Sequence, residues 1–77
     1  MQLAEVLKIT RQKAFMSQEE FAKALNVSVS TINRWETSKS KPNLTALKSI
    51  KSFCETYGLS YENIESGWFS HSLEDLK

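Results

Sequence analysis

A short polar face in residues 28–37 is the part of this sequence whose residue types and spacing could do specific chemistry. Val29, Ile32 and Trp35 are spaced by three, which predicts one apolar face of a helix. The side chains left on the other faces are those of Ser30, Thr31, Asn33, Arg34 and Thr37. They offer hydrogen-bond donors and acceptors, one positive charge and no acid. Such a face is suited to hydrogen bonds with base edges in a DNA major groove.

A second short helix is predicted directly before this one, over residues 17–25. Ser17 and Glu20 have the S-x-x-E spacing of a capping box, in which each side chain satisfies the other residue's backbone N–H. The apolar stripe of this helix consists of Phe21, Ala22 and Leu25. Asn26 suits the left-handed conformation of a sharp helix exit, and Ser28 can cap the next helix. Two short helices joined by a tight turn are the layout of a DNA-binding helix-turn-helix.

The runs SQEEFA, NVS and STINRWE are more specific than a bare helix-turn-helix pattern, which any two short helices can imitate. The residues that carry the resemblance are Arg11, Ser17, Gln18, Glu20, Ala22, Leu25, Val27, Ser28, Ile32, Trp35, Glu36, Lys39 and Pro42. This set resembles the lambda-repressor-like (Cro-type) helix-turn-helix family of bacterial and phage regulators, over roughly residues 3–57. The resemblance implies an all-α fold, a compact bundle of four to five helices with the helix-turn-helix at its second and third helices.

The rest of the chain is also predicted to be helical. The helices expected from apolar spacing cover residues 2–14, 17–25, 28–37, 44–57 and 60–66. Asn43 is a suitable N-cap for the fourth of these helices, and Gly58 suits its C-terminal end. Gly67 is expected to end the last helix, and residues 70–77 are expected to fray.

Two positions depart from the family pattern. Residue 15 is Phe and residue 38 is Ser, where relatives commonly have Gly. Gly adopts positive φ without steric cost. The resemblance therefore leaves the shapes of these two loops open.

The charge distribution favours a polyanionic partner despite a formal net charge of +1. Residues 1–53 contain nine basic and four acidic side chains, a balance of +5, whereas residues 54–77 contain one basic and five acidic ones, a balance of −4. A basic body is what phosphates would meet. The alternative is that several lysines only solvate helix surfaces, namely Lys8, Lys13, Lys23 and Lys48.

The inventory of reactive side chains argues against an enzyme. Cys54 and His71 are each the single residue of their kind, so the sequence has no Ser/His/Asp set, metal-ligand cluster or disulfide framework. There is no Gly-rich phosphate loop, and no cofactor is expected. A single cysteine suggests a buried thiol in a reducing compartment. No apolar run has membrane-spanning length, so we expect no membrane partner and a cytoplasmic, bacterial or phage-encoded protein associated with the nucleoid.

Side-chain chemistry and the resemblance together assign candidate DNA contacts. The residues expected to reach base edges are Val29, Ser30, Asn33 and Arg34. The residues expected at phosphates are Ser17, Gln18, Ser28, Thr37, Lys39, Lys41 and Asn43. Arg34 is the candidate for a guanine, because its planar fork can bond O6 and N7 together. The resemblance also implies an architectural ion pair between Arg11 and Glu36.

Alternatives stay open for several of these residues. Arg34 could contact a phosphate without reading sequence, and a small rotation of the helix would turn Asn33 to solvent. Val29 could belong to the core. Gln18 could face water or brace a side chain of the helix over residues 28–37. The lysine-rich segment 39–43 could be a solvated loop.

The C-terminal segment carries a heavy apolar load for its length, and part of it must cover the core. The candidates for a dimer surface are Tyr61, Ile64, Trp68 and Phe69. The domain organisation predicted here is a helix-turn-helix domain over residues 1–58 and a C-terminal extension over residues 59–77 that packs on it, dimerises, or both.

The leading functional hypothesis is a repressor-like, sequence-specific regulator of transcription that binds double-stranded DNA. We expect a homodimer on a palindromic operator, with residues 28–37 as the recognition helix in the major groove. The alternative is an antitoxin or adaptor that holds a protein partner through its acidic and aromatic C-terminal segment.

Overall fold

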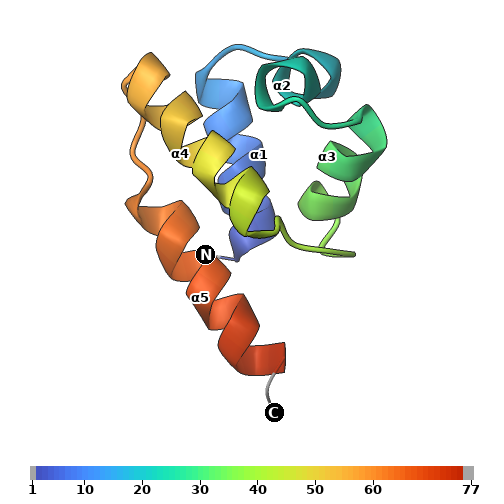
Figure 1. Cartoon of the computed structure of the whole chain (residues 1–77), viewed down its shortest axis with the longest axis vertical. Helices are drawn as coiled ribbons and strands as arrows, with labels where there is room; N and C mark the ends of the chain where they lie inside the picture. Colours follow the sequence, from blue (N-terminus) through green and yellow to red (C-terminus); the bar gives the residue numbers. More distant parts are fainter. Residues whose placement is uncertain (1, 76–77) are drawn as a thin grey trace.

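The structure is a computed structural model that describes the backbone of residues 2–75 and the side chains of residues 2–70. The described residues form five helices. They are α1 (Leu3–Lys13), α2 (Gln18–Leu25), α3 (Val29–Glu36), α4 (Leu44–Tyr57) and α5 (Glu62–Asp75). In Figure 1, α2 and α3 lie to one side of α1 and α4, and α5 runs past the N-terminus. The all-α bundle expected from the sequence is confirmed. No helix of the described part is long and apolar enough to cross a membrane.

All five helices contribute to one apolar core. Each provides at least one side chain that is at most 1% exposed, and these include Leu7, Phe21, Ile32, Ile50 and Ile64. The ring of Phe21 meets the ring of Phe53 edge-on at 5.1 Å between centroids. Helix α1 is central to this arrangement, since it packs against both α3 and α5. The helix-turn-helix is therefore held by elements on either side of it in the sequence.

The starts of three helices are capped by side chains, as the sequence predicted. Ser17 and Glu20 form the capping box at the start of α2, with both hydrogen bonds present. Ser28 caps α3 and Asn43 caps α4. Each N-cap of this kind contributes about 1 kcal/mol to stability. The helices thus begin one residue after the caps, which are the flanking residues rather than helical ones.

The first four helices all end in the same backbone motif. After each of them one residue adopts a left-handed conformation, and these residues are Phe15, Asn26, Ser38 and Gly58, with φ between 58° and 67°. The next residue donates its N–H to a carbonyl five residues earlier, as Met16 does to Arg11 at 3.2 Å and Lys39 does to Arg34 at 2.9 Å. This is the Schellman motif. The two loops without Gly therefore keep the shape that Gly would allow.

The predicted end of the last helix was wrong. Gly67 lies inside α5, which continues to Asp75 instead of ending at residue 66 or fraying from residue 70. A Cβ atom at Gly67 would lie 3.3 Å from the Cα of Leu3. The missing side chain thus lets α5 approach α1 closely, and it does not end the helix. Residues 76–77 of the predicted extension lie outside the described residues.

A bidentate ion pair ties α1 to the end of α3. Nε of Arg11 donates to Oε2 of Glu36 at 2.8 Å, and Nη2 donates to Oε1 at 3.0 Å. The two side chains are only 12% and 4% exposed. The hydrogen bond with Glu36 raises the pKa of Arg11 above its ordinary value, desolvation works against that rise, and the charge of Glu36 adds to it. The structure therefore contains the ion pair that the resemblance implied.

Replacing Phe15 with Gly should stabilise the fold by about 0.5–1 kcal/mol, because Gly is free of the strain that a Cβ atom meets in the left-handed region. Little packing is lost, since the Phe15 side chain is 94% exposed. Urea unfolding followed by circular dichroism measures the change. Phe15→Ala is the matched control, because it removes the same ring and keeps the Cβ atom. An equal gain in both variants would contradict the strain argument.

Replacing Arg11 with Met should lower the free energy of unfolding by about 3–5 kcal/mol, because Glu36 is left buried without its partner. Thermal and urea unfolding measure this loss.

Lys13→Met is the control for the Arg11 variant, since Lys13 is exposed on the same helix, and it should change stability by less than about 0.5 kcal/mol. The double variant Arg11→Met/Glu36→Leu should recover part of the loss, because no unpaired charge remains. A loss below about 1 kcal/mol in Arg11→Met would rule out a structural role for the pair.

Candidate nucleic-acid interface

Helix α3 presents a polar face to solvent because its opposite face is buried. The hydroxyl of Ser28 accepts a hydrogen bond from the backbone N–H of Thr31 at 3.1 Å, which fixes the start of the helix. Ile32 and Trp35 are 0% and 5% exposed and hold α3 against the core. The helix also packs against both α1 and α2. Its rotation about its own axis is therefore set, and so is the face that it displays.

The residues expected to reach base edges all lie on the exposed surface of α3; they are Val29, Ser30, Asn33 and Arg34. Ser30 lies four residues before Arg34, and Val29 four before Asn33, so each pair shares one side of the helix. Val29 is 42% exposed and is not part of the core. The displayed face thus combines a methyl-bearing side chain, an amide, a hydroxyl and a guanidinium.

Four residues expected at phosphates also cap or close helices. The side-chain oxygens of Ser17, Ser28 and Asn43 each accept a backbone N–H three residues further on, at 3.1, 3.1 and 2.8 Å. The hydroxyl of Thr37 donates to the carbonyl of Asn33 at 2.8 Å. All four side chains remain exposed. Because helix starts carry free backbone N–H groups and a partial positive charge, the starts of α2 and α3 are suited to phosphate oxygens.

Gln18 braces the end of α3 from the start of α2. Its Nε2 atom donates to Oε1 of Glu36 at 3.1 Å. Glu36 thereby accepts from Gln18 and Arg11 together, and the guanidinium of Arg11 also donates to the carbonyl of Met16 at 2.9 Å. One cluster of charged and polar groups thus connects α1, the turn after it, α2 and α3. The bracing role that the sequence left open is the one present in this structure.

The segment 38–43, called here the α3–α4 loop, holds the remaining phosphate candidates. Lys39 and Asn43 are exposed in it, and Lys41 is half-buried. The Nζ atom of Lys41 lies 4.2 Å from the centre of the Trp68 ring, over its face. The structure therefore brings Lys39 and Asn43 to the surface next to α3 and draws Lys41 toward α5.

The four dimer candidates have different surroundings in the structure. Ile64 is 0% exposed and belongs to the core of the chain, so it is not available to a second copy. Ile64 was a wrong candidate for a dimer surface, because it lies on the face of α5 that packs into the core. Tyr61 and Trp68 are half-buried against the core, while Phe69 is 56% exposed.

The sequence did not predict what Trp68 does inside the fold. Its indole Nε1 donates to the carbonyl of Pro42 at 2.6 Å, across 26 residues of sequence. The only signal in the sequence is the general one that a buried indole N–H needs an acceptor. Nothing in the spacing of the two residues identifies which acceptor it finds.

The described residues hold no group of three or more His, Cys, Asp or Glu side chains that could bind a metal ion. Cys54 is a free, buried thiol, and its burial raises the pKa of the thiol above the ordinary value. A thiol kept protonated in this way is a poor nucleophile. The expectation of a buried cysteine in the core is confirmed.

Comparison with known proteins agrees with this geometry. The chain is similar to the type II methyltransferase M.SsoII of Shigella sonnei, with 38% identity over 68 residues, which are 84% of this chain and 17% of that protein. No solved structure matches the chain. The family described as helix-turn-helix matches residues 7–61, a segment that contains both α2 and α3. This match supports double-stranded DNA as the partner. The chain therefore belongs to the helix-turn-helix family, as its resemblance to lambda-repressor-like regulators predicted.

Proposed function

We propose that this chain is a repressor-like regulator of transcription that recognises a specific double-stranded DNA sequence with α3. The observation that carries the proposal is the exposed polar face of α3, held in one orientation by the burial of Ile32 and Trp35 and by the Arg11–Glu36 pair. A recognition helix must present its side chains in a fixed register, because base edges are read by hydrogen bonds of defined geometry. A regulator of this kind acts by covering the DNA that polymerase needs.

Base recognition is assigned to the exposed residues of α3. Arg34 pairs with the O6 and N7 atoms of a guanine, and Asn33 is suited to an adenine. Val29 offers methyl groups to a thymine methyl. Ser30 adds a hydroxyl that can donate or accept.

Affinity is assigned to the residues on both sides of α3. Ser17 and Gln18 lie at the start of α2, where the helix dipole favours a phosphate. Lys39, Lys41 and Asn43 extend the same surface through the α3–α4 loop, and Ser28 and Thr37 flank α3 itself. Such contacts fix the position of the protein on the duplex and carry no sequence information.

A homodimer would place two copies of α3 in successive major grooves, about 34–36 Å apart, on a palindromic operator. The candidates that remain for its surface are the exposed Phe69 and the half-buried Tyr61 and Trp68. Selection of bound duplexes from a random library tests DNA binding, palindromy and half-site spacing together. Recovery of no enriched sequence would contradict the proposal.

We propose no catalytic activity for this chain. The similarity to M.SsoII extends over 17% of that protein, which leaves most of the methyltransferase without a counterpart in the compared residues. The exposed polar face of α3 and the loop beside it are suited to binding, and the buried thiol of Cys54 is a poor nucleophile.

Replacing Arg34 with Ala should weaken binding to the selected operator by ~1–3 kcal/mol and remove the preference at one base step. Arg34→Lys is the informative companion, because it keeps the charge and loses the planar fork. If Arg34 reads a guanine, both variants should relax the preference in a competition shift assay. A uniform loss over all sequences, restored by Lys, would instead identify Arg34 as a phosphate contact.

Replacing Lys39 with Ala should weaken binding to every duplex by a similar factor and reduce the slope of log K against log salt by about 1. The measurement is fluorescence anisotropy at several salt concentrations. Lys51→Ala removes the same charge from an exposed position of α4, outside the proposed interface, and serves as the control. Equal effects of the two variants would mean that Lys39 acts only through net charge.

A further inference from the structure

The α3–α4 loop is fixed at its first half by α3. The N–H of Ser38 donates to the carbonyl of Trp35 at 3.3 Å, and the N–H groups of Lys39 and Ser40 donate to the carbonyl of Arg34 at 2.9 and 3.4 Å. These bonds fold the loop back on the last turn of the recognition helix. They define the position of the backbone up to residue 40.

The second half of the loop is attached to α5. Pro42 has no N–H, so its carbonyl is its one backbone hydrogen-bonding group, and that carbonyl accepts from the indole of Trp68 at 2.6 Å. The ammonium of Lys41 lies over the face of the same ring, at 4.2 Å from its centre. Such a cation–π contact is favourable, because the negative face of the ring attracts the ammonium. One side chain of α5 thus holds two consecutive residues of the loop.

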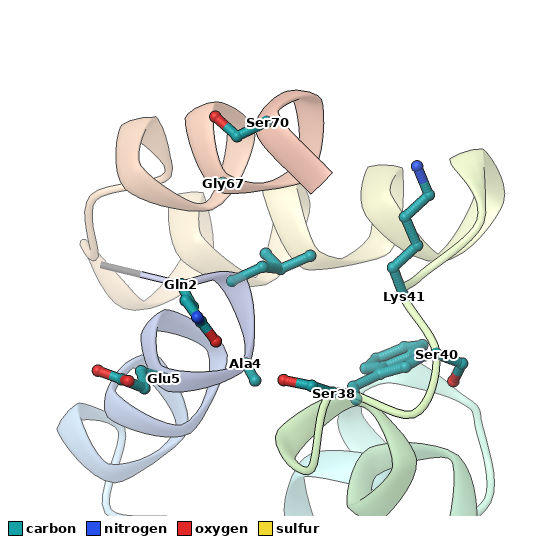
Figure 2. Close-up of a pocket in the computed structure, with 10 residues that line it drawn as sticks. Gln2, Ala4, Glu5, Ser38, Ser40, Lys41, Gly67 and Ser70 are labelled. Atoms are coloured by element: carbon teal, nitrogen blue, oxygen red, sulfur yellow. The ribbon is translucent and has the colours of Figure 1, made fainter. Parts of the chain in front are cut away.

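Packing holds one side of this part of the loop, since the side chain of Pro42 is less than 2% exposed, while the side that faces α1 is open. A hollow of about 480 Å³ lies between the start of α1, the loop and α5. Figure 2 shows Ser38 and Ser40 on the loop side of it and Gly67 and Ser70 on the α5 side. The described side chains leave this space open. The contacts of Trp68 therefore act together with the burial of Pro42 to define where residues 41 and 42 lie.

Helix α5 is itself firmly placed. Ile64 is fully buried in the core, and the backbone of Gly67 lies directly against Leu3 of α1. Trp68 follows Gly67, and its ring also meets the ring of Phe69 edge-on at 5.2 Å. The position of the Trp68 indole is thus set by the close contact between α5 and α1 at the preceding residue, Gly67.

From these contacts we propose that Trp68 is a positioning residue for the DNA-contacting loop, so that α5 helps to set the affinity for DNA. The inference rests on the proposed function and deepens it. Trp68 acts through the loop and touches no DNA. By holding Pro42 and Lys41, it sets where Lys41 and the adjoining Asn43 lie relative to α3, in the arrangement that phosphates meet. Without Trp68, the second half of the loop would have to become ordered on binding. The free-energy cost of that ordering would then lower the affinity for DNA.

Replacing Trp68 with Phe tests the proposal, because Phe keeps an aromatic ring and loses the N–H. Loss of one hydrogen bond should weaken operator binding by about fivefold. Ile64→Val is the matched control, because it weakens the packing of α5 without touching the loop. At a temperature where both variants are folded, the affinity of Ile64→Val for the operator should match that of the unchanged chain. Equal losses in the two variants would overturn the proposal, since stability alone would then explain them.

A double-mutant cycle separates positioning from general damage. In the Lys41→Ala background the effect of Trp68→Phe should shrink to less than about twofold, because the side chain that Trp68 holds is already absent. The slope of log K against log salt should also fall in Trp68→Phe and stay unchanged in Ile64→Val. Full additivity in the cycle, or an unchanged slope in Trp68→Phe, would overturn the proposal.

Amide hydrogen exchange without DNA gives a measurement that does not depend on the proposed function. In Trp68→Phe the amides of the α3–α4 loop should exchange faster while those inside α3 stay protected. Unchanged exchange in the loop would overturn the positioning role even if DNA binding is normal. If loop exchange changes as expected and the unchanged chain binds no duplex, the proposed function fails, and the DNA part of this inference fails with it.

Discussion

The geometry of the proposed interface depends above all on the buried pair of Arg11 and Glu36. The pair joins the last turn of α1 to the last residue of α3, and the same two side chains also engage the carbonyl of Met16 and the amide of Gln18. Separating the charges would leave one of them unpaired in a site with little water, which is strongly unfavourable. The Arg11–Glu36 pair therefore defines the orientation of α3 relative to α1 and α2, because any movement that separates the two charges has a large free-energy cost.

The two parts of the interface draw their rigidity from different sources. Helix α3 is held by its own buried side chains and by the pair at its end. The α3–α4 loop depends on hydrogen bonds back to Arg34 and on Trp68 of α5. Because α5 is placed by Ile64 and by the close approach of Gly67 to Leu3, the loop is connected to α1 as well. The C-terminal helix is thus a structural part of the proposed DNA-binding surface.

Local chemistry made much of this predictable. The starts of α2, α3 and α4 follow from Ser17, Ser28 and Asn43, because a cap acts on backbone groups within the next turn. The exposed face of α3 follows from helical spacing alone. The left-handed residues Phe15 and Ser38 were left open, because neither residue type favours that conformation and the motif that places them there is completed by backbone hydrogen bonds.

The sequence by itself determined the first four helices, the N-caps of α2, α3 and α4 and the polar surface of α3, since these depend on residues within a few positions of one another. Only the tertiary structure decided the length of α5, the burial of Ile64 and the partners of Gln18 and Trp68. Gly67 carries the local signal of a helix end, yet the space that it leaves is needed by Leu3 at the other end of the chain. Likewise, the acceptor of Trp68 lies 26 residues away, on Pro42. Contacts of this kind have no pattern in the sequence because they exist only once the helices are packed.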